Sequence, residues 1–404
     1  MIASVEVVVS RPGRNFVTVI ITTDDGVVGL GDATLNGREL SVVSYLRDHI
    51  APLLVGRDHH AIEDTWQYLY RGGYWRRGAV SMAAISAIDI ALWDIKAKLA
   101  GMPLYQLLGG ASRTAIRAYG HASGHTTEQL MNSVRERLAQ GFTAVRLQTG
   151  VPGLATSYGT GAPHSSAAYE PAQSGPRPAE ESWNTAAYLR HMPRVFEAVR
   201  SEFGDELDLL HDAHNRLTPT EAGRLGRDLE PYRPFWLEDV TPVENPESLR
   251  YVRQATTVPL AIGETFTSIH DAHLLMREQL IDYVRCAVSH AGGITAVRRI
   301  FDLAALYQVK SAVHGPSDIS PIGLSAALHL DLAINNFGIQ EFMQYPAETS
   351  EVFDVGYSFS GGSFRLGDRP GLGVEFDLDA ARALPYQQAY LPINRLTDGT
   401  MHDW

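Results

Sequence analysis

From residue 114 onwards, short apolar runs alternate with stretches of helical period, and this alternation constrains the fold more than any other feature of the sequence. Eight strand-like runs separated by helices are typical of a barrel of parallel strands. After the eighth run the chain turns loop- and strand-like instead of helical. We therefore expect an α/β fold, a modified TIM barrel of the (β/α)7β type. Its candidate strands are 115–119, 144–148, 207–212, 235–239, 259–264, 283–288, 311–314 and 338–342.

The residues on either side of the barrel have other patterns. Runs rich in β-branched residues at 4–9 and 16–23 precede an Asp24-Asp25-Gly26 turn signal, and the period becomes helical from about residue 58. One apolar helix face is marked by Met82, Ile85, Ile88, Ala91, Leu92, Ile95 and Leu99. Asp89 and Asp94 lie on the same helix, and we expect both to be structural. We predict an N-terminal α+β capping domain at 1–113, the barrel at 114–345, and a C-terminal extension at 346–404 that returns to the capping domain and the active site.

A segment at about 150–181 interrupts the alternation. It is rich in Gly, Pro, Ser and Ala and has no usable periodicity. Loops of this length inside a compact domain are usually lids or disordered insertions. Because it follows the second barrel strand, we expect it to lie over the active-site rim as a lid.

Three acidic residues close apolar runs at equal intervals of 26 residues: Asp212, Glu238 and Glu264. The carboxyl ends of barrel strands meet at one rim, where active sites of this fold lie. Mg²⁺ prefers oxygen ligands and takes few protein carboxylates. An acid at one strand end alone can equally cap the next helix, but three at equal spacing predict a Mg²⁺ site.

Further polar residues stand on the other strand ends. Arg146 lies on the second candidate strand, Arg285 on the sixth strand and His314 on the seventh strand. His214 lies two residues past Asp212. Asp318 and Glu341 follow on the last two strands. Each alone can be structural; for example, Glu341 can balance Arg285. Together they are too many buried polar groups for a purely structural account, since each must be paired or hydrogen-bonded.

This set of residues fits removal of a proton next to a carboxylate. A bound metal stabilises the enediolate that forms. Arg146 alone is a poor base because its pKa is very high. Tyr158, in the expected lid, is a better one, since a nearby cation favours phenolate. His214 is placed to protonate a departing hydroxyl, and His314 with Asp318 either orients hydroxyls or supplies a second acid or base.

Composition excludes several classes of partner. The net charge is −12 and basic residues never run beyond a pair, which argues against nucleic acid or an anionic membrane. No stretch approaches the roughly 20 apolar residues that span a bilayer. Cys286 is the only cysteine, so no disulfide forms within the chain, and with no secretory signal visible we expect a cytoplasmic protein.

The strand-end motifs resemble those of the enolase superfamily over essentially the whole chain, and within it the D-mannonate dehydratase subgroup, also described as a D-galactonate dehydratase family. The matching stretches are His211-Asp212-Ala213-His214, Trp236-Leu237-Glu238-Asp239, Gly263-Glu264, Ile281 to Arg285, His314-Gly315, Gly338 to Glu341 and Asp398 to Met401. Many superfamily members carry Lys-x-Lys on the second strand. This chain has Val145-Arg146-Leu147, as the subgroup does.

The resemblance implies one Mg²⁺ per subunit, a homo-oligomer, and a substrate that is a small acid sugar. It assigns the base to a Tyr158–Arg146 pair and the acid to His214. The implied reaction eliminates water from an aldonic acid, D-mannonate or D-gluconate being favoured, to give a 2-keto-3-deoxy sugar acid. The implied substrate contacts are Asn36, His121, His214, Glu264, Arg285, His314, Asp318, Glu341 and Trp404.

One position departs from the subgroup pattern. Efficient mannonate dehydratases carry Ala where this chain has Pro316, and proline fixes φ and removes an N–H donor. Two alternatives therefore stay open beside the dehydratase: an epimerase acting on the same intermediate, and a binding or regulatory protein that retains the Mg²⁺ site but has little activity.

Overall fold

The computed structural model describes residues 1–155 and 173–403. Eight parallel strands form the barrel, in the spatial order β12-β11-β10-β9-β8-β5-β4-β13, and the pairing of Ser311 with Phe337 joins the two ends. The eight predicted strands are confirmed, with shifted ends. They are β4 (Ile116–Gly124), β5 (Ala144–Thr149), β8 (Asp208–Asp212), β9 (Trp236–Glu238), β10 (Leu260–Ile262), β11 (Tyr283–Val284), β12 (Lys310–Ser311) and β13 (Gln340–Phe342).

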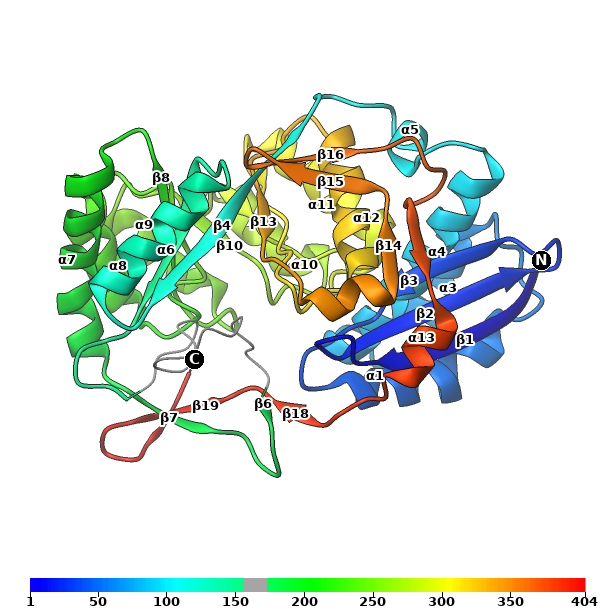
Figure 1. Ribbon diagram of the computed structural model, residues 1–404, viewed down its shortest axis with the longest axis horizontal. Coiled ribbons are helices and arrows are strands. Elements are labelled where there is room, and N and C mark those ends of the chain that lie inside the picture. The colour runs from blue at the N-terminus through cyan, green and yellow to red at the C-terminus, as the bar shows by residue number, and fades with distance from the viewer. Residues whose placement is uncertain (156–172, 404) are drawn as a thin grey trace.

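A helix follows each barrel strand except the last, which confirms the (β/α)7β type (Figure 1). Local signals start several of these helices. Thr126 with Gln129 and Thr218 with Glu221 form capping boxes, and each satisfies backbone N–H groups that the first helical turn leaves free. The helices are α6 (Thr127–Ala139), α7 (Thr185–Phe203), α8 (Pro219–Leu229), α9 (Leu249–Ala255), α10 (Ile269–Arg277), α11 (Gly293–Leu306) and α12 (Pro321–Ala333), with short 3-10 turns at Glu230–Tyr232 and Pro246–Ser248.

The interior of the barrel is packed with alternating large and small side chains. Tyr119 and Trp236 are fully buried there, opposite Ala144, Ala261 and Ala312. Such alternation fills a tapering space without voids. Residues two apart on a strand share a face, so Trp236 lies on the same side as Glu238 and donates its indole N–H to that carboxylate at 2.5 Å. The packed interior thus supports the polar groups at the rim.

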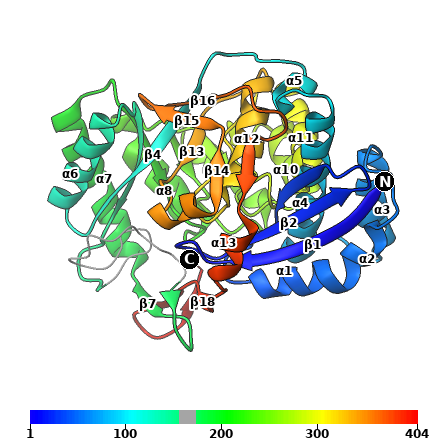
Figure 2. The same cartoon turned by 45° about the vertical axis from the view of Figure 1, so that its right-hand side comes forward.

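An antiparallel sheet and helices form the N-terminal part (Figure 2). The sheet has β1 (Ile2–Ser10), β2 (Phe16–Thr23) and β3 (Val28–Asp32), with the predicted turn at Gly26. The helices are α1 (Glu39–Tyr45), a π-helical turn at Leu46–Ile50, α2 (Ala51–Leu54), α3 (Ile62–Gly72), α4 (Ala79–Leu99) and α5 (Leu104–Leu107).

Helix α4 differs from the amphipathic helix that the sequence predicts. It is buried on almost every side, because β3 packs on one side of it and α11 of the barrel on another. Leu99, expected on its buried face, is 40% exposed. Gly31 permits the close approach of β3, since an added Cβ would lie 1.9 Å from the carbonyl oxygen of Ala87. The sequence does not show that two layers share this helix.

The residues after β13 run back across the molecule. β16 pairs with β4, and Arg11 N–H donates to the Leu384 carbonyl. Figure 1 shows the last strands reaching the segment after β5, where β18 pairs with β6 (Gln173–Ser174) and β19 with β7 (Glu180–Trp183). The bounds are β14 (Phe353–Val355), β15 (Tyr357–Ser360), β16 (Ser363–Leu366), β17 (Val374–Phe376), α13 (Leu378–Ala383), β18 (Ala389–Tyr390), β19 (Ile393–Leu396) and β20 (Met401–His402), after a 3-10 turn at Ala347–Glu351.

The predicted lid segment is only partly described. Its described part contains β6 and β7, two short strands that the sequence did not indicate. Both pair with the C-terminal strands, so their partners are more than 200 residues away and local periodicity does not show them. Among the described helices, none is both long and apolar enough to cross a membrane.

Candidate active site

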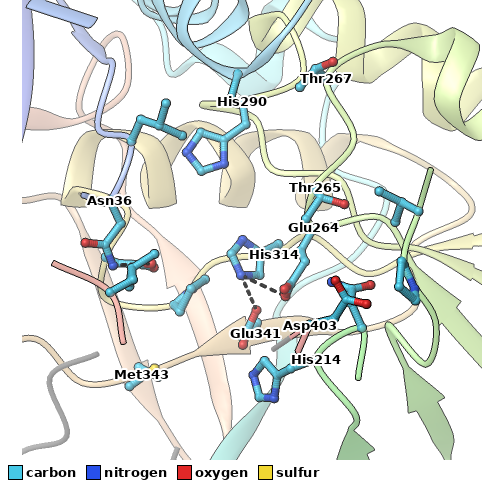
Figure 3. Close-up of a pocket in the computed structure, with 18 of the residues that line it drawn as sticks. Asn36, His214, Glu264, Thr265, Thr267, His290, His314, Glu341, Met343 and Asp403 are labelled. Atoms are coloured by element: carbon cyan, nitrogen blue, oxygen red, sulfur yellow. Dashed lines mark hydrogen bonds and ion pairs between the residues drawn. The ribbon is translucent and has the colours of Figure 1, made fainter. Parts of the chain in front are cut away.

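A cavity of about 670 Å³ opens at the carboxyl ends of the barrel strands, between the barrel and the N-terminal domain (Figure 3). This volume is within the usual range for small-molecule sites. Eight predicted site residues line it: Asn36, His121, Arg146, His214, Glu264, His314, Asp318 and Glu341. They come from the N-terminal domain and from the ends of the barrel strands β4, β5, β8, β10, β12 and β13, so the tertiary fold brings them together.

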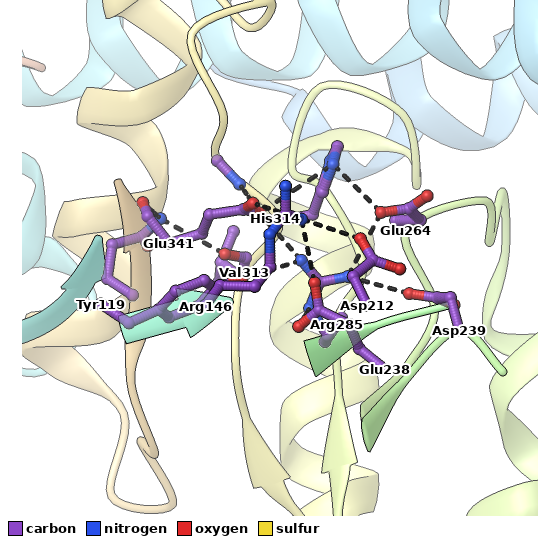
Figure 4. A network of polar contacts seen from close by, with 12 residues as sticks. Tyr119, Arg146, Asp212, Glu238, Asp239, Glu264, Arg285, Val313, His314 and Glu341 are labelled. Carbon is purple, nitrogen blue, oxygen red and sulfur yellow. Dashed lines mark hydrogen bonds and ion pairs between the residues drawn. The ribbon is translucent and has the colours of Figure 1, made fainter. Parts of the chain in front are cut away.

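Arg146 is buried among acidic side chains (Figure 4). Its Nη1 donates to Asp212 Oδ2 at 2.8 Å and to Glu238 Oε1 at 3.1 Å. Its Nη2 lies 3.1 Å from Nδ1 of His121, whose Nε2 lies 2.8 Å from Glu341 Oε1. Glu341 accepts only, so Nε2 carries the proton and Nδ1 accepts from Arg146. His121 therefore holds the guanidinium in place.

Arg285 is the second cation and is 0% exposed. It donates to Asp239 and Glu341 at 2.9 Å each, and to Glu264 at 3.3 Å. It also donates to the hydroxyl of Tyr119 at 3.0 Å. Asp239, which the sequence analysis did not single out, is thus a buried partner of Arg285. Its position directly after Glu238 at a strand end is a sequence signal that could have identified it as a site residue.

The five carboxyl groups around these two guanidiniums have pKa values that are shifted in opposite directions. Burial raises the pKa of Glu238 well above its usual range, and raises that of Glu264 to about 7 and that of Asp239 to about 8. For Asp212 and Glu341, burial is outweighed by neighbouring histidines and arginines, and both pKa values are lowered. Five acids face only two arginines, so without a further cation burial favours the protonated form of three of them.

The donor set fits Mg²⁺ in its chemistry, because Asp212, Glu238 and Glu264 offer carboxyl oxygens and an added cation would favour the ionised form of the two whose pKa burial raises. Within residues 1–155 and 173–403, however, no three acidic, histidine or cysteine side chains are arranged to hold a metal. In this structure Arg146 forms ion pairs with both Asp212 and Glu238 (Figure 4).

His214 does not reach the cavity from an extended strand. On such a strand, residues two apart would point the same way. The strand ends at Asp212, and His214 has φ of +49°, in the left-handed region. Its Nε2 lies 2.8 Å from Asp212 Oδ2 and its backbone N–H donates to Asp212 Oδ1 at 2.7 Å. Burial lowers the pKa of His214 to about 4.

His314 lies across the barrel from His214, since the third and seventh of eight strands are opposed. Its Nε2 is 3.4 Å from Glu264 Oε2 and 3.9 Å from Glu341 Oε2. Asn36, from the N-terminal domain, donates to Asp318 at 3.3 Å. Two predicted residues, Tyr158 and Trp404, fall outside the described residues.

Other cavity residues were missed by the sequence analysis. They include Arg14, from the N-terminal domain, and His290, five residues beyond Arg285 in the loop after β11. The rule applied to the other strands, that polar residues just past a strand end face the rim, would have found His290. No comparable local signal marks Arg14, which precedes a strand in another domain.

The sequence matches two family models: "Mandelate racemase / muconate lactonizing enzyme, N-terminal domain" at 5–109 and "Enolase C-terminal domain-like" at 129–381. It is 60% identical to a D-galactonate dehydratase family member of Pseudarthrobacter chlorophenolicus, across 100% of both chains. It is 57% identical to a D-mannonate dehydratase of a Sphingomonas species, across 100% of this chain and 99% of the relative. An enolase of Pantoea ananatis, crystallised with D-gluconate and Mg, superposes with a TM-score of 0.92 at 37% identity over 100% of both chains.

Proposed function

The chain belongs to the enolase superfamily, and from that membership we propose that it is a Mg²⁺-dependent acid-sugar dehydratase. The substrate would be an aldonic acid, with D-mannonate or D-gluconate favoured. Its α-proton would be removed to give an enediolate, and water would leave to give a 2-keto-3-deoxy sugar acid. Relatives named D-mannonate dehydratase and a structural neighbour that holds D-gluconate support this substrate class.

The observation that carries the proposal is the cluster of five carboxyl groups around two arginines in the floor of a sugar-sized cavity. Asp212, Glu238 and Glu264 would hold one Mg²⁺ per subunit. When bound, the ion supplies positive charge that stabilises the enediolate. Because Arg146 Nη1 contacts both Asp212 and Glu238, a bound ion would compete with the guanidinium for these two carboxylates.

Proton transfer is assigned to two different groups. Tyr158, activated by the positive charge of Arg146, would remove the α-proton. His214 would deliver a proton to the departing hydroxyl, for which it must first be protonated. His314, on the opposed strand, would orient hydroxyls together with Asp318. The homo-oligomeric assembly and cytoplasmic location expected from the sequence remain part of the proposal.

A protein that binds acid sugars but turns them over slowly is the second candidate. The observation that favours it is Pro316, which lines the cavity between His314 and Asp318. Proline restricts the backbone that carries these two side chains. The positions of both relative to a substrate are therefore sensitive to this residue.

The test is a panel of aldonic acids incubated with Mg²⁺ and assayed for 2-keto acid. The proposal expects product from at least one of them. No product, with thermal protection by the same acids, would favour the binding protein. In deuterated water, Tyr158→Phe should stop exchange of the substrate α-proton, and continued exchange would move the base elsewhere.

The metal site has its own test. Glu238→Gln should greatly weaken Mg²⁺ binding measured by calorimetry. Glu244→Gln is the matched control, because Glu244 lies at the same cavity but is exposed and outside the cluster. Equal Mg²⁺ affinity in the two variants would refute the assignment.

A further inference from the structure

His290 is a cavity residue that the proposed chemistry does not use. It lies in the loop after β11, and its ring faces the cavity from the side remote from His214, as Figure 3 shows. The carboxylate cluster and His214 lie towards the other end. A linear substrate held by its carboxylate at the cluster would extend its far end towards His290.

The protonation of the His290 ring follows from its one hydrogen bond. Nε2 lies 2.9 Å from the carbonyl oxygen of Thr34, and a carbonyl only accepts, so Nε2 carries the hydrogen. Burial lowers the pKa of His290, which keeps the ring neutral at pH 7. Nδ1 therefore has a free lone pair. In residues 1–155 and 173–403 no donor bonds it, and it is not among the buried unpaired atoms, so it is open to the cavity.

Contacts between the two domains hold this ring in place. Asp32 accepts from Ser289 Oγ at 2.9 Å and from the backbone N–H of Ser320 at 3.0 Å. Thr34 Oγ donates to the same Asp32 side chain at 2.6 Å. The residue before His290 and the residue that bonds its Nε2 are therefore both tied to one buried carboxylate. An acceptor that is fixed before the ligand arrives loses little entropy on binding.

The side chains at the His290 end of the cavity favour a ligand group that donates a hydrogen bond. Asp318 lies near it as a carboxylate, and Asn36 already donates to Asp318. Arg14 also lines the cavity, but its Nη1 donates to Ser317 Oγ at 2.7 Å. A terminal hydroxyl can donate to Nδ1 of His290, whereas a terminal carboxylate has no proton to donate and would face two acceptors.

We propose that Nδ1 of His290 accepts a hydrogen bond from the terminal hydroxyl of the bound acid sugar, and so selects aldonic acids over diacids of the same length. This inference rests on the proposed function and names the ligand class of the same cavity more closely. His290 is thus a substrate-binding residue that sets specificity, and it does not take part in proton transfer.

Two substitutions separate this role from a structural one. His290→Gln puts its amide near the Nε2 position, so it retains a donor to Thr34 but loses the acceptor at Nδ1. His290→Asn puts its amide near the Nδ1 position, so it retains an acceptor but loses the bond to Thr34. We expect His290→Gln to raise the KM for the best aldonic acid roughly tenfold with little change in kcat, and His290→Asn to raise it less. A purely structural role predicts the reverse order.

The ligand side of the bond is tested with the 6-deoxy form of the same aldonic acid. The wild-type protein should bind it roughly tenfold more weakly than the parent acid, whereas His290→Gln should bind both equally. His273→Gln, at an exposed histidine of α10, is the control and should behave as wild type.

Two results would overturn the inference alone: wild-type affinity in His290→Gln, or an equal loss for the 6-deoxy acid in wild type and variant. No binding of any aldonic acid by the wild-type protein, measured by thermal shift and by turnover, would overturn the proposed function and the inference with it. The two failures are therefore distinguishable.

Discussion

Asp89 provides a prediction whose size can be worked out from the structure. It is 2% exposed on α4, and its Oδ2 accepts from the backbone N–H of Thr295 at 2.9 Å, at the start of α11. Oδ1 is buried without a partner among the described residues. Burial raises the pKa of this carboxyl to about 7, against an ordinary value near 3.8, although the bond from Thr295 acts in the opposite direction.

The sign of the effect follows from the raised pKa. The folded protein favours the protonated form of Asp89. The folded protein is therefore most stable, as far as Asp89 is concerned, below about pH 4, and it loses stability as the pH rises towards 7. A shift of about 3 units corresponds to roughly 4 kcal/mol in total, because one unit is 1.36 kcal/mol. Between about pH 5 and pH 8 the loss is roughly 3 kcal/mol.

Asp89→Asn removes the ionisation and retains an oxygen that accepts from Thr295. The stability advantage of this variant over wild type, measured as the difference in free energy of unfolding, should therefore grow by roughly 3 kcal/mol between about pH 5 and pH 8. Urea denaturation at several pH values measures it. Asp48→Asn, at an exposed carboxylate of the same domain, is the control. A difference for Asp89→Asn that does not change with pH would refute the reasoning.

Three further predictions concern the site and its support. Arg285→Met leaves buried carboxylates without their cation and should cost about 3–5 kcal/mol of folding free energy, and a loss below about 1 kcal/mol would contradict it. Gly31→Ala puts a Cβ 1.9 Å from the Ala87 carbonyl oxygen, so the melting temperature should fall sharply; an unchanged one would show that β3 can move away. His121→Phe frees Arg146 on one side and should lower kcat/KM at least roughly tenfold with the circular dichroism spectrum unchanged, and full activity would show that His121 does not hold Arg146.

Much of the fold was readable from the sequence because its signals are local. Strand and helix periods, capping boxes such as Thr126 with Gln129, and the Gly26 turn each depend on a few neighbouring residues. β6 and β7 were not readable, because their partners lie in the C-terminal strands. The all-round burial of α4 was not readable either, since it depends on two domains meeting at one helix.

The sequence by itself determined which residues stand at the strand ends, because in a barrel the end of each strand is fixed by its apolar run. Only the tertiary structure decided how those residues pair. Glu238 contacts both Arg146 and Arg285, whereas the adjacent Asp239 contacts Arg285. Arg146 lies between two acids, and Nε2 of His290 is bonded to the other domain. Charge pairing and burial depend on distances between groups from many strands, and their combined effect sets protonation. No single stretch of sequence carries that information.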